Sequence, residues 1–159
     1  MNLFTLLNSR PKPIRIGIIG AGKFATMFFA QALKIPSIHI VGIVDLYPEK
    51  AKSNMEMVGW DTSAFETNNL SNAFSTGKTF ISDDWEALVS HESIEIIIEC
   101  TGNPISAVKH CLSAFKNQKN VINVTVEADA FCGFALSQKA KDAGVIYSMA
   151  YGDQPALTC

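Results

Sequence analysis

A glycine turn and an acidic residue are the groups whose types and spacing could do chemistry. The turn, residues 20–25 with the pattern GxGxxA, is followed about 20–25 residues later by Asp45. Such glycines let backbone N–H groups approach a pyrophosphate, and a small third residue lets helix pack closely on strand. An acid at this spacing accepts both hydroxyls of an adenine ribose. The pattern predicts dinucleotide binding by Gly20, Ala21, Gly22, Lys23, Phe24 and Asp45.

Each of these features also has a plainer interpretation. The glycine pattern occurs in ordinary strand-to-helix turns, and an aspartate such as Asp45 also serves as a helix N-cap. The surrounding sequence favours binding, because residues 14–19 and 39–44 resemble buried strands and apolar residues between them recur at helical spacing. The unpaired N–H groups and the positive dipole end of that helix would then meet the phosphates.

A second glycine turn, residues 101–103, follows the apolar segment 94–98 and precedes a helix that Pro104 begins. A third turn, residues 126–129, follows the apolar segment 121–124. Because ligands bind outside the carboxyl ends of parallel strands, we expect these turns to share one crevice with the first. Thr101, Gly102 and Asn103 therefore join the predicted cofactor-binding residues.

Strand and helix patterns alternate through the chain. The expected strands are 14–19, 39–44, 79–81, 94–98, 121–124 and 145–148, with helices between them that include one at 129–143. A capping box with Asp83 as its acceptor predicts the helix after the third strand. The alternation predicts an α/β, Rossmann-type doubly wound, mainly parallel six-stranded sheet with helices on both faces. Residues 1–13 are expected to form a helical extension, and 14–159 the NAD(P)-binding domain.

Composition narrows the classes of partner. The 159 residues are 48% hydrophobic with a net charge of −2, which fits one globular domain and offers no basic excess for nucleic acid or an anionic membrane. Four scattered cysteines form no metal or disulfide pattern, so we expect no metal and a cytoplasmic location. The apolar start is too short to span a bilayer. The three histidines favour structural roles.

Beyond the glycine pattern, a wider similarity is carried by residues 1–3, 15–24, 99–104, 126–129 and 151–157, the last two segments being the most specific. Over essentially its whole length the chain resembles the homoserine-dehydrogenase-like oxidoreductases with a C-terminal SAF domain, a group that includes a reductoisomerase acting on deoxyxylulose phosphate. The resemblance implies hydride transfer between NAD(P) and a small hydroxy or keto substrate. Because the family continues past this segment, it also implies that the chain is the N-terminal domain only, as a fragment or a shortened product.

The resemblance leaves the catalytic groups weakly defined. Related dehydrogenases have a lysine after the fifth strand, where this chain has Glu127. Glu127 is one catalytic candidate, and its alternative role is an acid that flanks a helix start. Asp153, beside Tyr151, is the second candidate, and its alternative role is a domain-boundary turn. A non-catalytic NAD(H)-binding module or sensor and a reductoisomerase fragment stay open as alternative functions.

The expected cofactor is NAD(P), with NAD favoured. Asp45 would place a negative charge where the 2′-phosphate of NADP lies, although Lys50 or Lys52 could fold back to offset it. The expected partner is a small-molecule substrate, and a homo-oligomer stays open. Because no lysine follows the fifth strand and no second domain is in the sequence, we expect cofactor binding without turnover by this chain alone.

Overall fold

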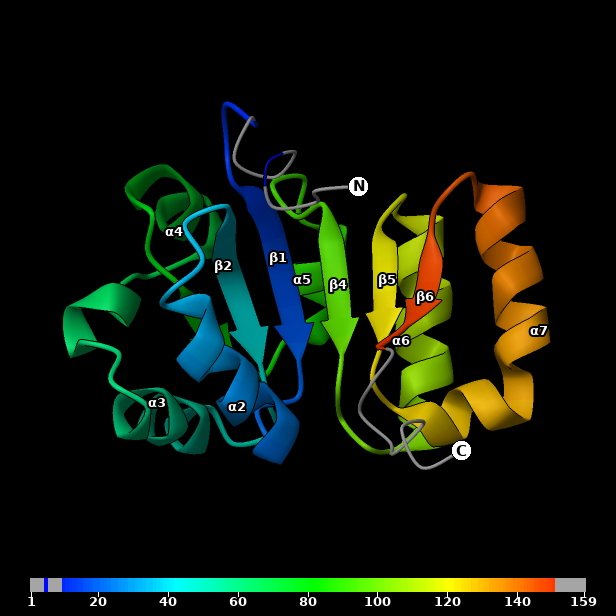
Figure 1. The fold of residues 1–159 in the computed structure, drawn as a ribbon, viewed down its shortest axis with the longest axis horizontal. Coiled ribbons are helices and arrows are strands. Elements are labelled where there is room, and N and C mark those ends of the chain that lie inside the picture. Colours follow the sequence, from blue (N-terminus) through cyan, green and yellow to red (C-terminus); the bar gives the residue numbers. More distant parts are fainter. Residues whose placement is uncertain (1–4, 6–9, 151–159) are drawn as a thin grey trace.

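A six-stranded sheet runs through the computed structural model, which describes residue 5 and residues 10–150 (Figure 1). Its spatial order is β3-β2-β1-β4-β5-β6, and every neighbouring pair is parallel. The predicted Rossmann-type doubly wound fold is confirmed, and the described sheet is parallel throughout. The strands are β1 (Ile14–Ile19), β2 (Ile38–Val44), β3 (Phe80–Ser82), β4 (Ile96–Glu99), β5 (Asn120–Asn123) and β6 (Tyr147–Met149).

Helices cover both faces of the sheet, as predicted. Helices α2 and α3 pack on one face around Phe29 and Met55, and α4 to α7 pack on the other around Leu88 and Phe115. All four of these side chains are at most 3% exposed, as in a close-packed core. The bounds are α2 (Lys23–Ala32), α3 (Pro48–Met57), the 3₁₀ helix η1 (Thr62–Phe65), α4 (Leu70–Thr76), α5 (Trp85–Ser90), α6 (Pro104–Lys116) and α7 (Val126–Ala143).

The topology creates a switch point at the carboxyl end of β1. This strand lies between β2 and β4, so the connections that leave β1 and β4 run to opposite faces of the sheet. In Figure 1 the strand arrows all point downward, which places both glycine turns at the lower edge. Open α/β sheets bind ligands in the crevice that forms at such a point.

Two predicted helix starts were wrong by a few residues. The α5 cap is Asp84, whose Oδ1 accepts the Ala87 N–H at 2.9 Å, and not Asp83. Helix α7 begins at Val126 and not at Asp129, and its N-cap is Thr125. The predicted extension 1–13 lies mostly outside the described residues, and residues 10–13 contain a bend and no helix.

A helix that crosses a bilayer must be both long and apolar. Within residue 5 and residues 10–150, no helix combines the length and the apolar character that crossing a bilayer requires.

Candidate functional site

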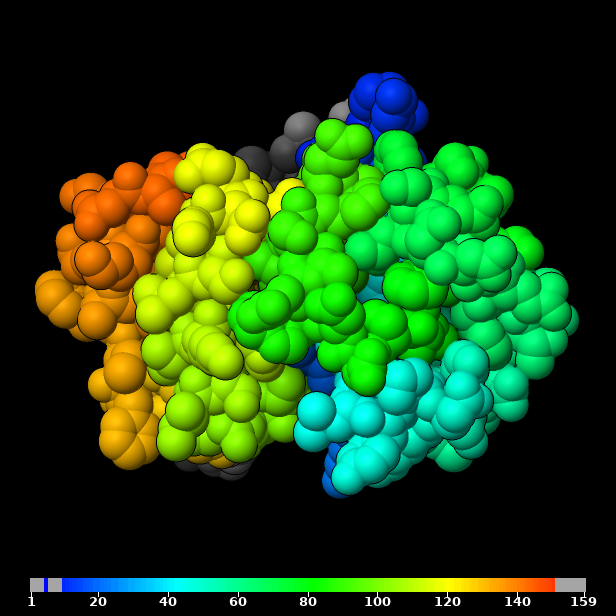
Figure 2. Space-filling model, turned by 180° about the vertical axis from the view of Figure 1, so that it is seen from behind, coloured from blue at the N-terminus to red at the C-terminus, as the bar shows by residue number. Residues whose placement is uncertain are grey.

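A cavity of about 490 Å³ opens where β1, β2 and β4 end. Its size lies in the range of pockets for small molecules and cofactors. Figure 2 shows blue spheres of the N-terminal strand-turn segment through a hollow between the cyan, green and yellow-green parts of the surface. The predicted binding residues that line this cavity are Gly20, Gly22, Asp45, Thr101 and Asn103. The two glycine turns are therefore brought together, as the sequence predicted, whereas the predicted third turn, residues 126–129, does not line this cavity.

The two glycines of the first turn are required for different reasons. Gly20 has a φ of +98°, and a Cβ there would lie 2.7 Å from the Cys100 carbonyl oxygen, so a side chain is excluded by the fold itself. A Cβ on Gly22 would meet no atom within 4 Å. That position lines the cavity, so a side chain on Gly22 would fill space that is open to a ligand.

The N-terminus of α2 is not blocked by a capping side chain. Gly22 is its N-cap, and no side chain caps the helix. The first N–H groups of a helix have no partner inside the helix, and the dipole makes this end partly positive. Lys23 is exposed there, whereas Phe24 packs against the buried cluster under α2. An anionic group such as a pyrophosphate fits this turn.

Asp45 joins the end of β2 to the first turn. Its Oδ2 accepts the Ala21 N–H at 2.7 Å, and its Oδ1 accepts the Tyr47 N–H at 2.9 Å. It caps no helix, because the α3 N-cap is Tyr47 and carries no side-chain cap. Each carboxylate oxygen has a second lone pair. Asp45 can therefore still accept ligand hydroxyls.

The second turn uses its backbone donors internally. The Gly102 N–H donates to Thr125 Oγ1 at 3.0 Å, and the Asn103 N–H donates to Thr101 Oγ1 at 3.3 Å. The side chain of Asn103 caps α6 by accepting the Ser106 N–H at 3.0 Å. This turn therefore lacks the open donors that make the first one suitable for phosphate.

Behind the second turn lies Glu99, to which the sequence analysis gave no role. Its side chain is 0% exposed. Oε1 accepts the Thr101 hydroxyl at 2.6 Å and lies 3.2 Å from His110 Nδ1, while Oε2 accepts the Thr125 hydroxyl. The available signal was an acid at the end of an isoleucine strand, since a charge is rarely buried without partners.

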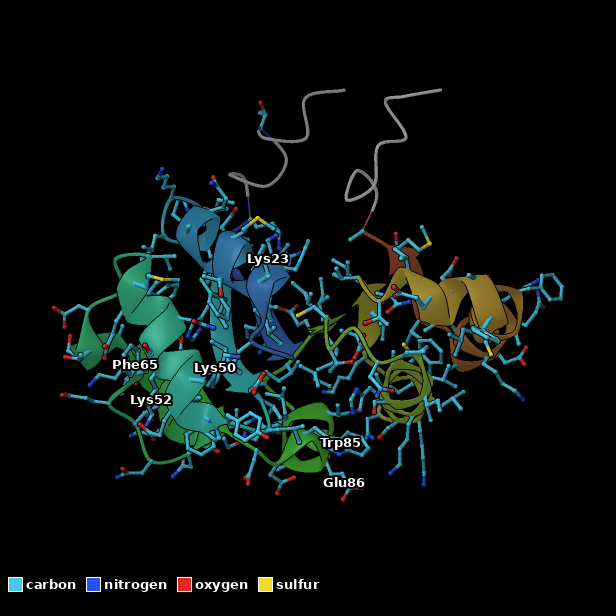
Figure 3. The ribbon with its side chains drawn as sticks, turned by 90° about the horizontal axis from the view of Figure 1, so that it is seen from below. Lys23, Lys50, Lys52, Phe65, Trp85 and Glu86 are labelled. Atoms are coloured by element: carbon cyan, nitrogen blue, oxygen red, sulfur yellow. The ribbon has the colours of Figure 1, made fainter. Side chains whose placement is uncertain are left out.

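The far end of the cavity is aromatic and was also missed. Trp85 and His110 line it, with ring centroids 4.8 Å apart, and Lys109 Nζ lies 5.7 Å from the Trp85 ring centroid. Figure 3 looks onto the carboxyl edge and shows Trp85 of α5 near α6, whereas Lys50 lies on α3. A planar base can pack against an exposed face of such a side chain. In the sequence, His110 had no visible partner because Glu99 meets it only through the fold.

The structure adds no support for a catalytic role of Glu127 or Asp153. Glu127 lies exposed in the first turn of α7, where an acid stabilises the helix, and it does not line the cavity. Asp153 and Tyr151 lie outside the described residues. Asp129 accepts the Tyr147 hydroxyl at 3.0 Å, and burial, followed by this hydrogen bond, raises the pKa of Tyr147.

Cys100 lines the cavity beside the first turn. Its Sγ donates to the Gly20 carbonyl oxygen at 3.0 Å, and burial, with the charge of Glu99 next, raises the pKa of this thiol. Nucleophilic cysteines have lowered pKa values, so the thiol is a packing group here. In the described part of the chain, no group of three or more His, Cys, Asp or Glu is arranged to hold a metal.

The family described as "Oxidoreductase family, NAD-binding Rossmann fold" (GFO/IDH/MocA) matches residues 14–151. No curated protein matches the chain. Similar solved structures include a homoserine dehydrogenase from Thiobacillus denitrificans (19% identity, TM-score 0.65, 87% of this chain, 29% of that one) and an NAD binding oxidoreductase from Klebsiella pneumoniae (16%, 0.64, 92% and 37%).

A third similar structure is a biliverdin reductase from Synechocystis, in complex with biliverdin and NADP+ (16% identity, TM-score 0.61, 87% of this chain, 38% of that one). At these identities the structures support the fold alone. The chain spans 29 to 38% of the length of these three proteins. The family match covers most of the sequence, and the matched residues include both glycine turns and the residues that line the cavity. The chain therefore belongs to the oxidoreductase family with an NAD-binding Rossmann fold.

Proposed function

We propose that this chain holds an NAD(P) cofactor across the carboxyl ends of β2, β1 and β4, as part of an oxidoreductase. The observation that carries the proposal is Gly22, an uncapped helix start at which a Cβ would enter the open cavity. In this arrangement the N–H groups that begin α2 hold the pyrophosphate, and Asp45 accepts hydroxyls of the adenine ribose. The base lies at the aromatic end beside Trp85.

NAD is the proposed form, ahead of NADP. Asp45 and Asp83 both line the cavity and would repel a 2′-phosphate. Lys52 is not free to offset them, because its Nζ lies 2.7 Å from Glu49 Oε1. Lys109 is the one lysine or arginine among the described residues that line the cavity. The biliverdin reductase structure contains NADP+, so this preference rests on the charges of this chain.

The proposed reaction is hydride transfer between the nicotinamide and a small hydroxy or keto substrate held by a second domain. The cofactor supplies or accepts the hydride, and the residues of this chain bind and orient it. The resemblance to homoserine dehydrogenases supports this class, and two homoserine dehydrogenases are among the similar structures. Glu127, the described one of the two catalytic candidates, does not line the cavity, which favours the alternative of a binding module or sensor for the chain alone.

One pair of experiments tests both levels of the proposal. Titration with NADH and NADPH, followed by nicotinamide fluorescence, should show binding with NADH the tighter ligand. A steady-state assay with homoserine, other hydroxy acids or sugar acids should show no NADH formation above background. Absence of binding would contradict the cofactor proposal, tighter NADPH binding would contradict the preference, and turnover would contradict the need for a second domain.

A further inference from the structure

Glu99 does not itself line the cavity proposed for the cofactor, yet it is fully buried at the carboxyl edge of the sheet. It ends β4, where it pairs with Ile19 of β1 on one side and Asn123 of β5 on the other. A buried carboxylate is costly unless donors surround it. Glu99 has such donors from three elements, namely the second glycine turn, the turn after β5, and α6.

The hydrogen bonds around Glu99 run in one direction. The hydroxyls of Thr101 and Thr125 both donate to its carboxyl oxygens. Each hydroxyl oxygen then accepts a backbone N–H, from Asn103 at 3.3 Å and from Gly102 at 3.0 Å. Two chains therefore run from a backbone amide through a hydroxyl to one carboxylate.

His110 adds a third connection, because its Nδ1 lies 3.2 Å from the same carboxylate. An acceptor at this position places the proton on Nδ1. Among the described residues no fully buried side-chain nitrogen or oxygen lacks a partner, and His110 lines the cavity. Its Nε2 therefore meets the cavity. Glu99 thus ties α6 and the second turn into one unit.

We propose that Glu99 is a positioning residue for the nicotinamide half of the dinucleotide, acting through Thr101 and Thr125. This inference rests on the proposed function. The strand order is β2-β1-β4, and the adenine ribose and pyrophosphate are assigned to the ends of β2 and β1. The next part of the ligand then meets the turn after β4. Because the amides of Gly102 and Asn103 point inward, this turn receives a neutral ribose that brings its own donors, and not a phosphate.

The first test is Glu99→Gln, which keeps the shape but replaces one acceptor oxygen by an NH₂ donor. One of the two threonine hydroxyls must then turn round to accept the new NH₂ group, and its own O–H loses the buried acceptor. Leaving a buried donor unpaired is unfavourable. We expect the Kd for NADH to rise about tenfold, while the Kd for ADP, which lacks the nicotinamide half, changes less than about twofold. Calorimetry measures both ligands.

A matched pair at Thr125 tests the same connection without changing the buried charge. Thr125→Val removes the hydroxyl and should reproduce the selective loss of NADH affinity. Thr125→Ser keeps the hydroxyl and should restore affinity to within about twofold of wild type. A role limited to stability would weaken NADH and ADP binding together and would not separate Ser from Val. Far-UV circular dichroism confirms that each variant is folded, and if Glu99→Gln is not, the Thr125 pair decides.

The outcomes separate this inference from the proposed function. Wild-type binding of NADH with equal loss of NADH and ADP in the variants, or with no loss, overturns the positioning role and leaves the cofactor proposal intact. A wild-type chain that binds neither ligand overturns both. Selective loss of NADH in Glu99→Gln and Thr125→Val, with rescue by Thr125→Ser, supports the inference.

Discussion

The two glycine turns look alike in sequence, but their backbone N–H groups differ in whether they have partners within the protein. At the first, Gly22 is the N-cap of α2 and no side chain caps the helix, so the first amides of α2 stay available. At the second, Asn103 caps α6, and the Gly102 amide donates to Thr125. An anion is stabilised only where donors are open. A strand-glycine-helix pattern therefore marks the edge of a site, and the neighbouring polar side chains decide which ligand group the turn can bind.

Gly22→Val is expected to have the largest effect on NADH and ADP affinity. The added side chain fills the open space at the α2 N-terminus, so NADH and ADP affinities should fall by more than about 100-fold. The charge-assisted contacts that are lost there contribute up to roughly 3 kcal/mol each. Because no atom lies within 4 Å of the added Cβ, far-UV circular dichroism should stay nearly unchanged.

The matched control is Gly102→Val in the second turn. Its Cβ also meets nothing within 4 Å, but its φ of +70° makes a side chain strained, so thermal stability should fall by about 1–2 kcal/mol. ADP affinity should stay within a few-fold of wild type. Equal loss of ADP affinity in the two variants would show that the two turns do not differ in phosphate binding.

Asp45→Asn gives the next largest effect. The amide keeps one acceptor oxygen but loses the charge that repels a 2′-phosphate and the strong acceptance of ribose hydroxyls. We expect NADH affinity to fall about tenfold and the ratio of NADPH to NADH affinity to rise. A fluorescence titration with both cofactors measures the ratio. An unchanged ratio would show that Asp45 serves only the Ala21 and Tyr47 amides.

The sequence predicted the fold and the first turn well because both depend on local patterns. Isoleucine-rich strands, the GxGxxA spacing and Asp45 are each visible within about 25 residues. The structure places Asp45 against the turn, as the spacing indicated. Helix starts were less certain, because Asp83 and Asp84 are adjacent and chemically equivalent caps.

The rest of the site depends on contacts between distant segments. Glu99 and Thr125 are 26 residues apart, and their hydrogen bond exists only because β4 and β5 are neighbours. Trp85 and His110 meet because α5 and α6 pack on the same face. A pattern of residue types along the chain does not contain such pairings. The buried acid of a strand was the one local signal that was available.

Asn103→Ala should have a smaller effect, on stability more than on binding. Removing the side chain that accepts the Ser106 N–H leaves the start of α6 uncapped, which costs about 1 kcal/mol. Chemical denaturation measures this loss, and Asn103→Asp, which keeps the acceptor, should recover most of it. ADP affinity should stay nearly constant. A large loss of ADP affinity would show that the second turn holds phosphate after all.

The smallest expected effect lies at the opposite end of the sheet, where Glu95 accepts the Arg15 backbone N–H at 2.9 Å and its Nε at 3.0 Å. Partial burial raises the pKa of Glu95, but the Arg15 hydrogen bonds and charge outweigh it, so the pKa is lowered from 4.5. Stability from a lowered carboxyl pKa is fully present above the unfolded value and is lost as pH falls through the folded value.

Glu95→Gln should therefore lower the free energy of unfolding at pH 7 by under about 1 kcal/mol, because the pair is partly exposed and screened by solvent. The difference from wild type should shrink as the pH falls below about 4, where the wild-type carboxyl also loses its charge. Urea denaturation at several pH values measures it. NADH and ADP affinities should not change, because this pair lies at the amino end of the strands, away from both glycine turns. A loss of cofactor affinity in this variant would mean that stability alone controls binding. The different effects of variants in the two turns would then not report on phosphate binding.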